Sequence, residues 1–298
     1  MTAFVLVSGG YTGGWLWREV AAGLRAAGAE VHPATLTGLG DRRHLAGPGV
    51  DLDTHIEDLV QLIDHVDAPE VVLVGYCYGI YPSAGAAGRR PDRVSRLVYL
   101  DSPMPQDGYS MIDQIREQMP DGPARDRALR QQERAEDGWR IPAPTRAEWR
   151  AHGNLAGVPD EALDRLARLA SPAPAGPYAQ RLRLSAAVAA LPMTGVFCTT
   201  GGTMDIAALE ALVASGLPLV QHLVDERATF FELATGHWPM LSTPDELTDV
   251  LLRAAAGGGH RLAGPAAATA QDPTAQDPTA QDPTAQDASA AGSSATLS

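Results

Sequence analysis

The ten residues Val-Val-Leu-Val-Gly-Tyr-Cys-Tyr-Gly-Ile, at positions 71–80, decide the fold of this sequence. An apolar run ends at Gly75, a cysteine stands two positions later, and Gly79 completes the pattern Gly-x-Cys-x-Gly. Such a pattern is typical of a tight strand-to-helix turn that lifts a nucleophile, usually serine, above the edge of a sheet. A free cysteine is more often a small buried apolar residue. Its place in this turn, here called the elbow (residues 75–79), favours a nucleophilic Cys77.

Strand and helix patterns alternate on both sides of the elbow. Short apolar runs predict six strands, at residues 3–7, 31–36, 70–75, 94–101, 194–198 and 228–233. Apolar residues at helical spacing predict helices between them, for example the stripe of Ile56, Leu59, Val60, Ile63 and Val66. Strands separated by helices form parallel sheets. The sequence therefore predicts an α/β fold with a doubly wound, mostly parallel sheet.

Two segments depart from this alternation. Residues 103–191 are rich in Arg, Glu, Pro and Ala and contain short helical patterns but no recognisable strand. Trp139 and Trp149 are unfavourable when exposed, so we expect an ordered helical cap here rather than a loose excursion. Near the C-terminus the pentapeptide Gln-Asp-Pro-Thr-Ala repeats, which predicts a disordered tail at 257–298. The sheet core is then expected at residues 1–102 and 192–256.

Composition narrows the partners and the location. The chain has 298 residues, of which 45% are hydrophobic, and a net charge of −13 without a basic cluster, which argues against a nucleic-acid partner. No apolar run reaches membrane-spanning length, no signal sequence precedes the first strand, and two cysteines make no disulfide framework. We therefore expect a cytoplasmic protein with a small-molecule partner. Metal-ligand spacing and a nucleotide-binding glycine loop are missing, so no cofactor is expected. The oligomeric state, a homodimer included, stays open.

A histidine late in the chain supplies a partner for the cysteine. His237 lies in a loop directly after the last predicted strand, which fits the chain order nucleophile, acid, histidine. The weaker histidine candidates are His32, His55, His65 and His222. Backbone N–H groups are expected to form an oxyanion hole, from Gly10 after the first strand and from Tyr78 at the start of the helix that follows the elbow.

Five motifs together resemble a known family. They are Gly-Gly-Trp-Leu-Trp at 13–17, Leu-Thr-Gly-Leu-Gly at 36–40, the elbow, Leu-Val-Tyr-Leu-Asp at 97–101, and the stretch 236–244 that begins with Gly-His. From Ala3 to Leu252 the sequence resembles the α/β-hydrolase group that includes plant methyl-ester esterases, hydroxynitrile lyases and bacterial esterases of aromatic polyketide pathways. The cap is the least matched part. The sequence has Ser8-Gly9 where that group usually has His-Gly. It also has Tyr76 and Ile80 where that group usually has histidine and glycine, so its elbow is bulkier and the site is expected to be narrower.

The acid of the expected triad has two candidates. The resemblance implies an acid just after the fifth predicted strand, but residues 199–202 read Thr-Thr-Gly-Gly and the first carboxylate there is Asp205. Asp101 ends the fourth strand, next to the elbow strand, which is the other position where hydrolases of this fold carry the acid. A carboxylate there can hold the Nδ1–H of His237. Asp101 is the favoured acid and Asp205 the alternative, while a turn-capping role for Asp101 stays open.

Cysteine in place of serine changes the expected chemistry. A thiol beside a histidine can ionise before attack, whereas a serine hydroxyl loses its proton during attack. We therefore expect a Cys77–His237–Asp101 triad that cleaves or transfers the acyl group of an ester, thioester or lactone, in specialised metabolism of the polyketide kind. The side chains expected to line the substrate pocket are Tyr11, Trp15, Tyr76, Tyr78, Tyr81, Met104, Trp238 and Met240.

The same residues leave two other functions open. A lyase would use them for acid–base elimination of a carboxylate such as acetate, which the resemblance makes reachable because the group includes lyases. A non-catalytic ligand receptor on a decayed hydrolase scaffold is the third interpretation. The retained cysteine and histidine argue against a receptor.

Overall fold

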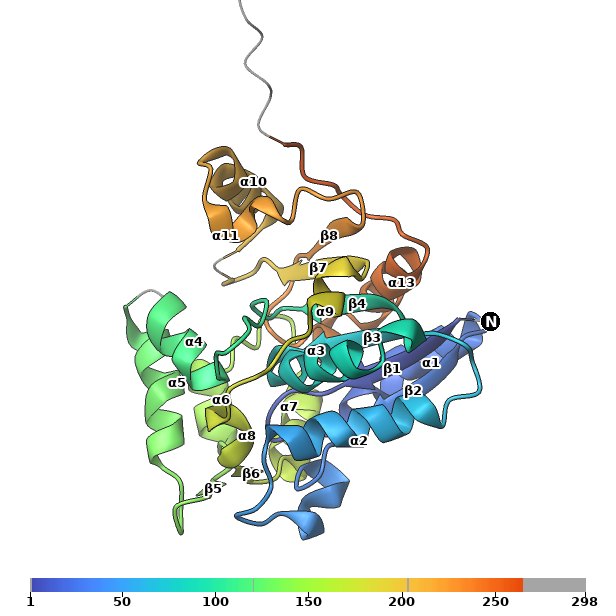
Figure 1. Cartoon of the computed structure of the whole chain (residues 1–298). Helices are drawn as coiled ribbons and strands as arrows, with labels where there is room; N and C mark the ends of the chain where they lie inside the picture. Colours follow the sequence, from blue (N-terminus) through green and yellow to red (C-terminus); the bar gives the residue numbers. More distant parts are fainter. Residues whose placement is uncertain (1, 120, 203, 265–298) are drawn as a thin grey trace, which may run out of the picture. The chain divides into compact units, whose positions relative to one another are not determined.

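Six parallel strands form the sheet that carries the site. The computed structural model describes residues 2–119, 121–202 and 204–264. The strands are β1 (Ala3–Val7), β2 (Glu30–Ala34), β3 (Val71–Tyr76), β4 (Val94–Leu100), β7 (Met193–Cys198) and β8 (Ala228–Leu233). Their order is β2-β1-β3-β4-β7-β8, and every neighbouring pair is parallel (Figure 1). The predicted parallel α/β sheet is confirmed, and β3, which leads into the elbow, lies near its centre.

Helices cover both faces of this sheet. The four that pack on it in pairs are α1 (Arg18–Ala26) with α13 (Pro244–Ala255), and α2 (Leu52–Asp64) with α3 (Ile80–Arg89). The chain moves from β1 outward to β2 and then back across β1 to β3. Because such crossovers are right-handed, α1 and α2 lie on opposite faces. Figure 1 shows α2 and α3 side by side on one face.

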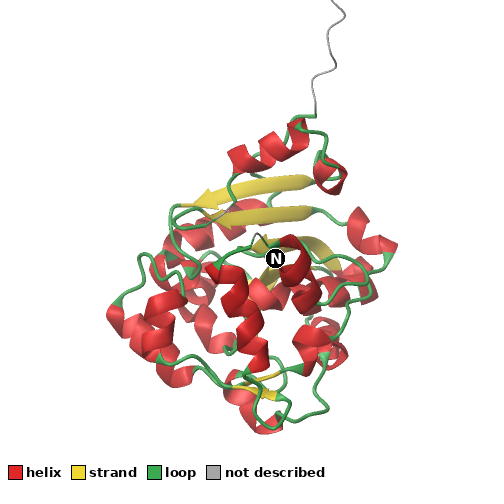
Figure 2. Ribbon diagram, turned by 90° about the vertical axis from the view of Figure 1, so that its left-hand side faces the viewer, coloured by secondary structure: helices red, strands yellow, loops and turns green. Residues whose placement is uncertain are grey.

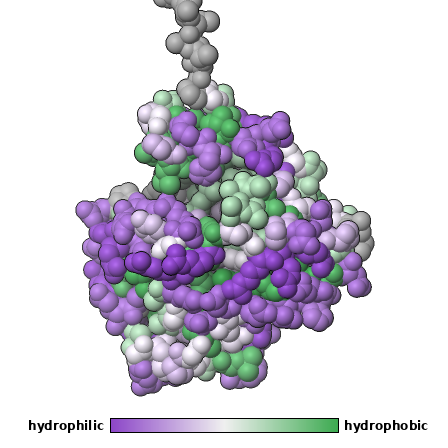
Figure 3. Space-filling view, in the orientation of Figure 1, coloured by the Kyte–Doolittle hydropathy of each residue, from purple (hydrophilic) through white to green (hydrophobic). Residues whose placement is uncertain are grey.

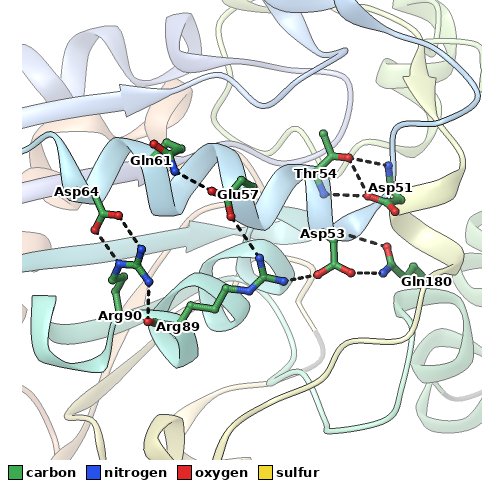
Figure 4. A network of polar contacts seen from close by, with 9 residues as sticks. All are labelled: Asp51, Asp53, Thr54, Glu57, Gln61, Asp64, Arg89, Arg90 and Gln180. Carbon is green, nitrogen blue, oxygen red and sulfur yellow. Dashed lines mark hydrogen bonds and ion pairs between the residues drawn. The ribbon is translucent and has the colours of Figure 1, made fainter.

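Polar contacts fasten α3, the helix after the elbow, to α2 (Figure 4). Arg89 pairs with Asp53 and Glu57, and Arg90 forms two bonds of 2.7 Å with Asp64. Exposed ion pairs contribute little free energy each, so they align the helices more than they stabilise them. The stabilising contact is the apolar stripe of α2, whose members Ile56, Leu59, Val60 and Ile63 are all buried, while Val66, which was predicted to belong to the stripe, is buried just beyond the end of the helix.

The segment between β4 and β7 forms a cap made mainly of helices. They are α4 (Met111–Gln118), α5 (Pro123–Glu133), α6 (Arg146–His152), α7 (Asp160–Leu169), α8 (Gly176–Ala179) and α9 (Ala186–Ala190). The expectation that this segment holds no strand is wrong. β5 (Arg140–Ile141) pairs antiparallel with β6 (Ala173–Pro174), and Figure 2 shows the pair below the main sheet. Strands of two residues are too short to show a periodic pattern.

The folded chain continues beyond residue 256, where the core was expected to end. His260 and Phe230 exchange two backbone hydrogen bonds of 2.8 and 2.9 Å, and Leu262 is only 7% exposed. The predicted tail boundary at 257 is therefore too early, because residues 257–264 pack beside β8. The repeats of the predicted tail lie outside the described residues.

The β8 end of the sheet carries its own small apolar cluster. It includes α10 (Ile206–Ala214) and α11 (Pro218–Gln221), and its main buried members are Leu209, Val213, Val220, Leu223, Phe230 and Leu262. Figure 3 shows apolar residues gathered over these two helices. Leu217 and Leu219 are 40% and 51% exposed there. This end of the sheet is thus covered by a layer separate from the main core.

Candidate active site

The elbow is a tight turn between β3 and α3. Cys77 follows β3 directly and has a φ of +52°, a left-handed conformation that strains a residue with a β-carbon. Glycine is required on both sides. A β-carbon on Gly75 would lie 2.6 Å from Ile80 Cα, and one on Gly79 would lie 2.5 Å from the Ser8 carbonyl oxygen. The strained turn thereby leaves the free thiol of Cys77 partly exposed at the end of β3.

Asp101, His237 and Cys77 come together at the carboxyl ends of the strands. Nδ1 of His237 lies 2.5 Å from Oδ2 of Asp101. The other carboxylate oxygen accepts a 3.1 Å hydrogen bond from the Cys198 N–H, which fixes the carboxylate against β7. The imidazole also forms a side-chain hydrogen bond with Cys77. The arrangement can hold one imidazole tautomer and present its other nitrogen to the thiol.

The pKa of His237 is raised to about 10. Burial alone would lower this pKa, but the hydrogen bonds of the imidazole to Asp101 and Cys77, together with its electrostatic interactions with these two side chains, outweigh burial. The imidazole of His237 is therefore protonated at neutral pH. A protonated imidazole in this position can act as a general acid toward a leaving group.

Asp205, the alternative acid, and Cys198, the second cysteine, both have surroundings that indicate a structural role. The Asp205 carboxylate accepts a 2.7 Å hydrogen bond from the Ala208 N–H and is the N-cap of α10. The structure thus joins His237 to Asp101 and uses Asp205 as a helix cap. Cys198 is 1% exposed, and burial together with the charge of Asp101 raises the pKa of its thiol. Such a thiol stays protonated and inert.

The loop after β1 is tied together by Ser8, which stands where the resembled group usually has histidine. Its hydroxyl donates to the Gly13 carbonyl at 2.7 Å and accepts from the indole N–H of Trp17 at 3.1 Å. Thr12 adds a 3.0 Å hydrogen bond to the Gly9 carbonyl. These bonds order the segment that is expected to carry part of the oxyanion hole.

The two glycines of this loop lie against the elbow and the cap. A β-carbon on Gly9 would lie 3.0 Å from Cys77 Cβ. A β-carbon on Gly10 would lie 2.4 Å from the hydroxyl oxygen of Tyr178, a cap residue in α8. The expected oxyanion-hole segment therefore borders the cysteine, and a side chain at its second position would displace the Tyr178 hydroxyl. The sequence contains no signal that would have connected Tyr178 with this loop.

Cap residues also hold the histidine loop. The backbone N–H of His237 donates to the Asn154 carbonyl at 3.0 Å, and the indole N–H of Trp238 donates to the Gly153 carbonyl at 2.8 Å. Asn154 has a φ of +43° and its side chain donates to the Thr200 carbonyl at 3.1 Å. Asparagine tolerates this conformation better than most residues. Asn154 was missed by the sequence analysis because a single asparagine in a cap loop forms no motif.

Aromatic side chains surround the imidazole. The ring of Tyr76 lies 5.0 Å from that of His237, centre to centre, and the ring of Trp238 lies 5.8 Å from it. Trp149 of α6 stands perpendicular to Trp238 at 5.1 Å, and Tyr11 packs on Trp149 at 6.2 Å. Tyr11, Tyr76 and Trp238 were expected to line the pocket, whereas Trp149 was expected only to order the cap. Together the four rings form an apolar wall beside the triad.

The other expected pocket residues have different neighbours. The Tyr81 hydroxyl donates to Oε1 of Gln114 at 2.6 Å, and the Gln114 side-chain amide donates to the Met104 carbonyl at 2.6 Å. These bonds link α3 to α4 of the cap. Trp15 lines a cavity of 770 Å³ that also touches Arg168 and that no triad residue lines. Met240 is fully buried in the core.

The side chain of Tyr78, an elbow residue, is hydrogen-bonded to the buried His55. Nε2 of His55 lies 2.8 Å from the Thr37 carbonyl oxygen, which only accepts, so this nitrogen carries the hydrogen. Nδ1 then accepts from the Tyr78 hydroxyl at 2.7 Å. Burial lowers the pKa of His55, and this effect exceeds the opposing contributions of the Thr37 bond and of Asp58. His55, a weak catalytic candidate, is thus a neutral residue that anchors the elbow.

In residues 2–119, 121–202 and 204–264, no group of three or more His, Cys, Asp or Glu side chains is arranged to hold a metal ion. The helices found in those same ranges are all too short or too polar to cross a membrane.

The fold and the site agree with a known family. The alpha/beta hydrolase family matches residues 4–250, so the chain belongs to this family and is a hydrolase-fold enzyme. An extracellular alpha/beta-hydrolase from a Paenibacillus species has a TM-score of 0.67 at 22% identity, over 85% of this chain and 99% of that one. Polyneuridine aldehyde esterase has a TM-score of 0.65 at 19% identity, over 86% of this chain and 99% of that one. Likenesses at this identity show the fold alone.

Sequence relatives include proteins named as esterases. A carbendazim hydrolyzing esterase of Nocardioides sp. is 42% identical over 120 residues, which are 40% of this chain and 50% of that protein. Methylesterase 8 of Arabidopsis thaliana is 37% identical over 107 residues, which are 34% of this chain and 38% of that protein. The chain thus matches half or less of the length of these relatives. The resemblance to the methyl-ester esterase group is confirmed at the level of the family.

Proposed function

We propose that this chain is an esterase-type hydrolase or acyltransferase in which Cys77 is the nucleophile, His237 the acid–base group and Asp101 the residue that orients His237. The observation that carries the proposal is the hydrogen-bonded series from Asp101 through His237 to Cys77, with Cys77 in a strained turn. The esterase names of the sequence relatives support an ester substrate. Thiolates react best with activated acyl groups, so thioesters, lactones and esters with good leaving groups fit this site.

The reaction would proceed in two halves. The Cys77 thiolate, whose proton is held by His237, bonds to the carbonyl carbon while the π electrons of the carbonyl move to oxygen, giving an anion that the N–H groups of Gly10 and Tyr78 would stabilise. The bond to the leaving group then breaks, and that group takes the proton of His237 while a thioester remains on Cys77. Water, deprotonated by the neutral His237, attacks the thioester and releases a carboxylic acid and the thiol. An acceptor alcohol in place of water gives acyl transfer.

The aromatic wall supports a planar, largely apolar substrate. The rings form a connected series in which neighbouring ring centres are at most 6.2 Å apart. The series runs from Tyr11 to Trp149, Trp238, His237 and Tyr76. Aromatic surfaces of this kind bind flat apolar groups through buried area and ring contacts. We infer an aromatic ester, thioester or lactone, and the resemblance to esterases of polyketide pathways favours a role in specialised metabolism.

Intact-mass analysis tests the proposal. The protein is exposed to p-nitrophenyl acetate and, separately, to the acetyl thioester of N-acetylcysteamine. We expect a mass increase of one acetyl group in the wild type and none in Cys77→Ala. Turnover that persists in Cys77→Ala would contradict the proposal. Loss of a carboxylate from a substrate without any adduct would indicate the lyase, and reversible binding of a flat aromatic ester without conversion would indicate the receptor.

A further inference from the structure

One side chain of the cap, Tyr178, reaches the expected oxyanion hole. Tyr178 is 4% exposed, and its hydroxyl oxygen has no hydrogen-bond partner among the described residues. A β-carbon on Gly10 would lie 2.4 Å from this oxygen, so the hydroxyl lies directly against the Gly10 backbone. Buried hydroxyl groups without a partner are rare because they lose their hydrogen bonds to water. The Tyr178 hydroxyl is therefore a buried donor that lacks an acceptor.

The ring of Tyr178 also lies on the elbow. Its centre is 4.5 Å from the ring centre of Tyr78, the residue after the cysteine. Gly9 lies against Cys77, and the next residue, Gly10, lies against the Tyr178 hydroxyl. These two glycines therefore connect Tyr178 with the cysteine. Burial raises the pKa of Tyr178 well above its ordinary value. The phenol stays protonated and can only donate to an anion.

Contacts on either side of Tyr178 fix its position. Gly176 allows α8 to approach the core, because a β-carbon there would lie 2.5 Å from the Val50 carbonyl oxygen. The side chain of Gln180 accepts a 2.7 Å bond from the first backbone N–H of α2 and donates a 2.8 Å bond to Asp53 (Figure 4). The tyrosine thus stands between two anchors, each two residues away. Its hydroxyl is held in place before any substrate binds, as catalytic donors need to be.

We propose that Tyr178 is a catalytic residue whose hydroxyl donates a hydrogen bond to the acyl oxygen of the substrate. This inference rests on the proposed acyl chemistry of Cys77. The bond strengthens as the carbonyl oxygen gains negative charge, and no proton leaves Tyr178 in the step. The cap then adds a side-chain donor to the N–H groups of Gly10 and Tyr78. Substrates are acyl compounds whose carbonyl oxygen points toward the cap.

The variant Tyr178→Phe removes the hydroxyl and keeps the ring. With p-nitrophenyl acetate, kcat is expected to fall about 10²-fold while KM stays within about threefold, because the lost bond acts mainly in the transition state. The alkylation rate of Cys77 by iodoacetamide should stay unchanged, since that reaction forms no oxyanion. A purely structural role would slow both reactions by displacing Cys77. Tyr109→Phe is the matched control, a cap tyrosine whose hydroxyl pairs with Glu117, and should keep full turnover.

The variant Cys77→Ala separates the two proposals. If it retains turnover, the acyl chemistry fails and the role of Tyr178 fails with it. If it is inactive while Tyr178→Phe turns over normally, only the role of Tyr178 is wrong. Slower alkylation in Tyr178→Phe would likewise overturn the catalytic role.

A stability measurement tests the position of the hydroxyl independently of activity. Gly10→Ala should lower the melting temperature of the wild type, where the new β-carbon meets the Tyr178 hydroxyl oxygen at 2.4 Å. In Tyr178→Phe the nearest ring carbon is 3.5 Å away, an ordinary contact, so the loss should be smaller. Equal losses in the two backgrounds would show that the hydroxyl does not lie at Gly10 and would overturn the proposal.

Discussion

The carboxyl ends of β3 and β7 each carry a cysteine at the same edge of the sheet, and the two thiols have opposite surroundings. Cys77 follows β3, is partly exposed and lies beside a protonated His237. Cys198 is the last residue of β7, is buried, and its thiol pKa is raised by burial and by Asp101. Asp101 touches both ends, since one carboxylate oxygen faces His237 and the other accepts the Cys198 N–H.

The difference shows that the two strand ends contribute to the site in different ways. After β3 a left-handed residue turns the chain so that the Cys77 side chain leaves the sheet, whereas Cys198 is still paired within β7 and its side chain stays in the core. The β7 end acts through its backbone, by holding the carboxylate that orients the imidazole. The reactivity that we propose for Cys77 therefore depends on one backbone turn and one histidine rather than on the residue type.

The largest effect is expected when the β3 thiol is removed. Cys77→Ala should lower the kcat for p-nitrophenyl acetate by at least about 10³-fold, because the covalent step is lost. Cys198→Ala keeps the backbone N–H that holds Asp101 and should change kcat by less than about threefold. The two variants are compared by steady-state kinetics. Similar losses in both would mean that the two ends do not differ in function.

The next effect concerns the carboxylate that both ends share. Asp101→Asn should lower turnover by at least about 10²-fold, because the imidazole loses its orienting acceptor. Asp205→Asn weakens only the cap of α10 and should lower turnover by less than about tenfold. Circular dichroism first establishes that both variants fold. A strong loss in Asp205→Asn with near-normal Asp101→Asn would assign the acid to the β7 side.

Chemical labelling compares the two thiols directly. Near neutral pH, iodoacetamide should alkylate Cys77 at least about tenfold faster than Cys198, because Cys77 is partly exposed beside an imidazolium and Cys198 is buried. Peptide mapping by mass spectrometry follows each site with time. Equal, slow labelling would make Cys77 a structural cysteine like Cys198.

The protonated imidazole gives the stability a pH dependence. Because folding raises the pKa of His237 from 6.5 to about 10, its contribution to the free energy of unfolding is fully present below pH 6.5. The contribution declines as the pH rises from there and is lost above about pH 10. The stability difference between the wild type and His237→Gln should therefore shrink from pH 6.5 to 9 in urea unfolding. A constant difference would mean that His237 is not charged in the folded state.

The smallest effect concerns the free energy of unfolding, which should depend more on Cys198 than on Cys77. Cys198→Ala should lower the free energy of unfolding by about 1 kcal/mol, since it leaves a small cavity at the end of β7. Cys77→Ala removes a partly exposed side chain and should change it by less than about 0.5 kcal/mol. Both values come from urea unfolding. A larger loss for Cys77→Ala would show that the thiol packs as part of the core.

Local sequence patterns predicted the sheet and the residues of the proposed triad, but they did not reveal the long-range contacts. The elbow, Asp101 and His237 each follow a strand that an apolar run reveals, and the ends of parallel strands meet at one edge. The two-residue strands β5 and β6 and the packing of Leu262 depend on partners far away in the sequence. The same holds for Asn154 and Tyr178, whose contacts to the site involve loops more than 80 residues away.

The sequence by itself determined the α/β hydrolase architecture, the cysteine at the elbow and the histidine after the last strand. These follow from apolar periodicity and from glycines that only a tight turn requires. Only the tertiary structure decided which carboxylate faces His237, which cysteine is buried, and which cap residues complete the site. Those choices depend on backbone register and on side-chain contacts between elements that are distant in the chain, and no local pattern records them.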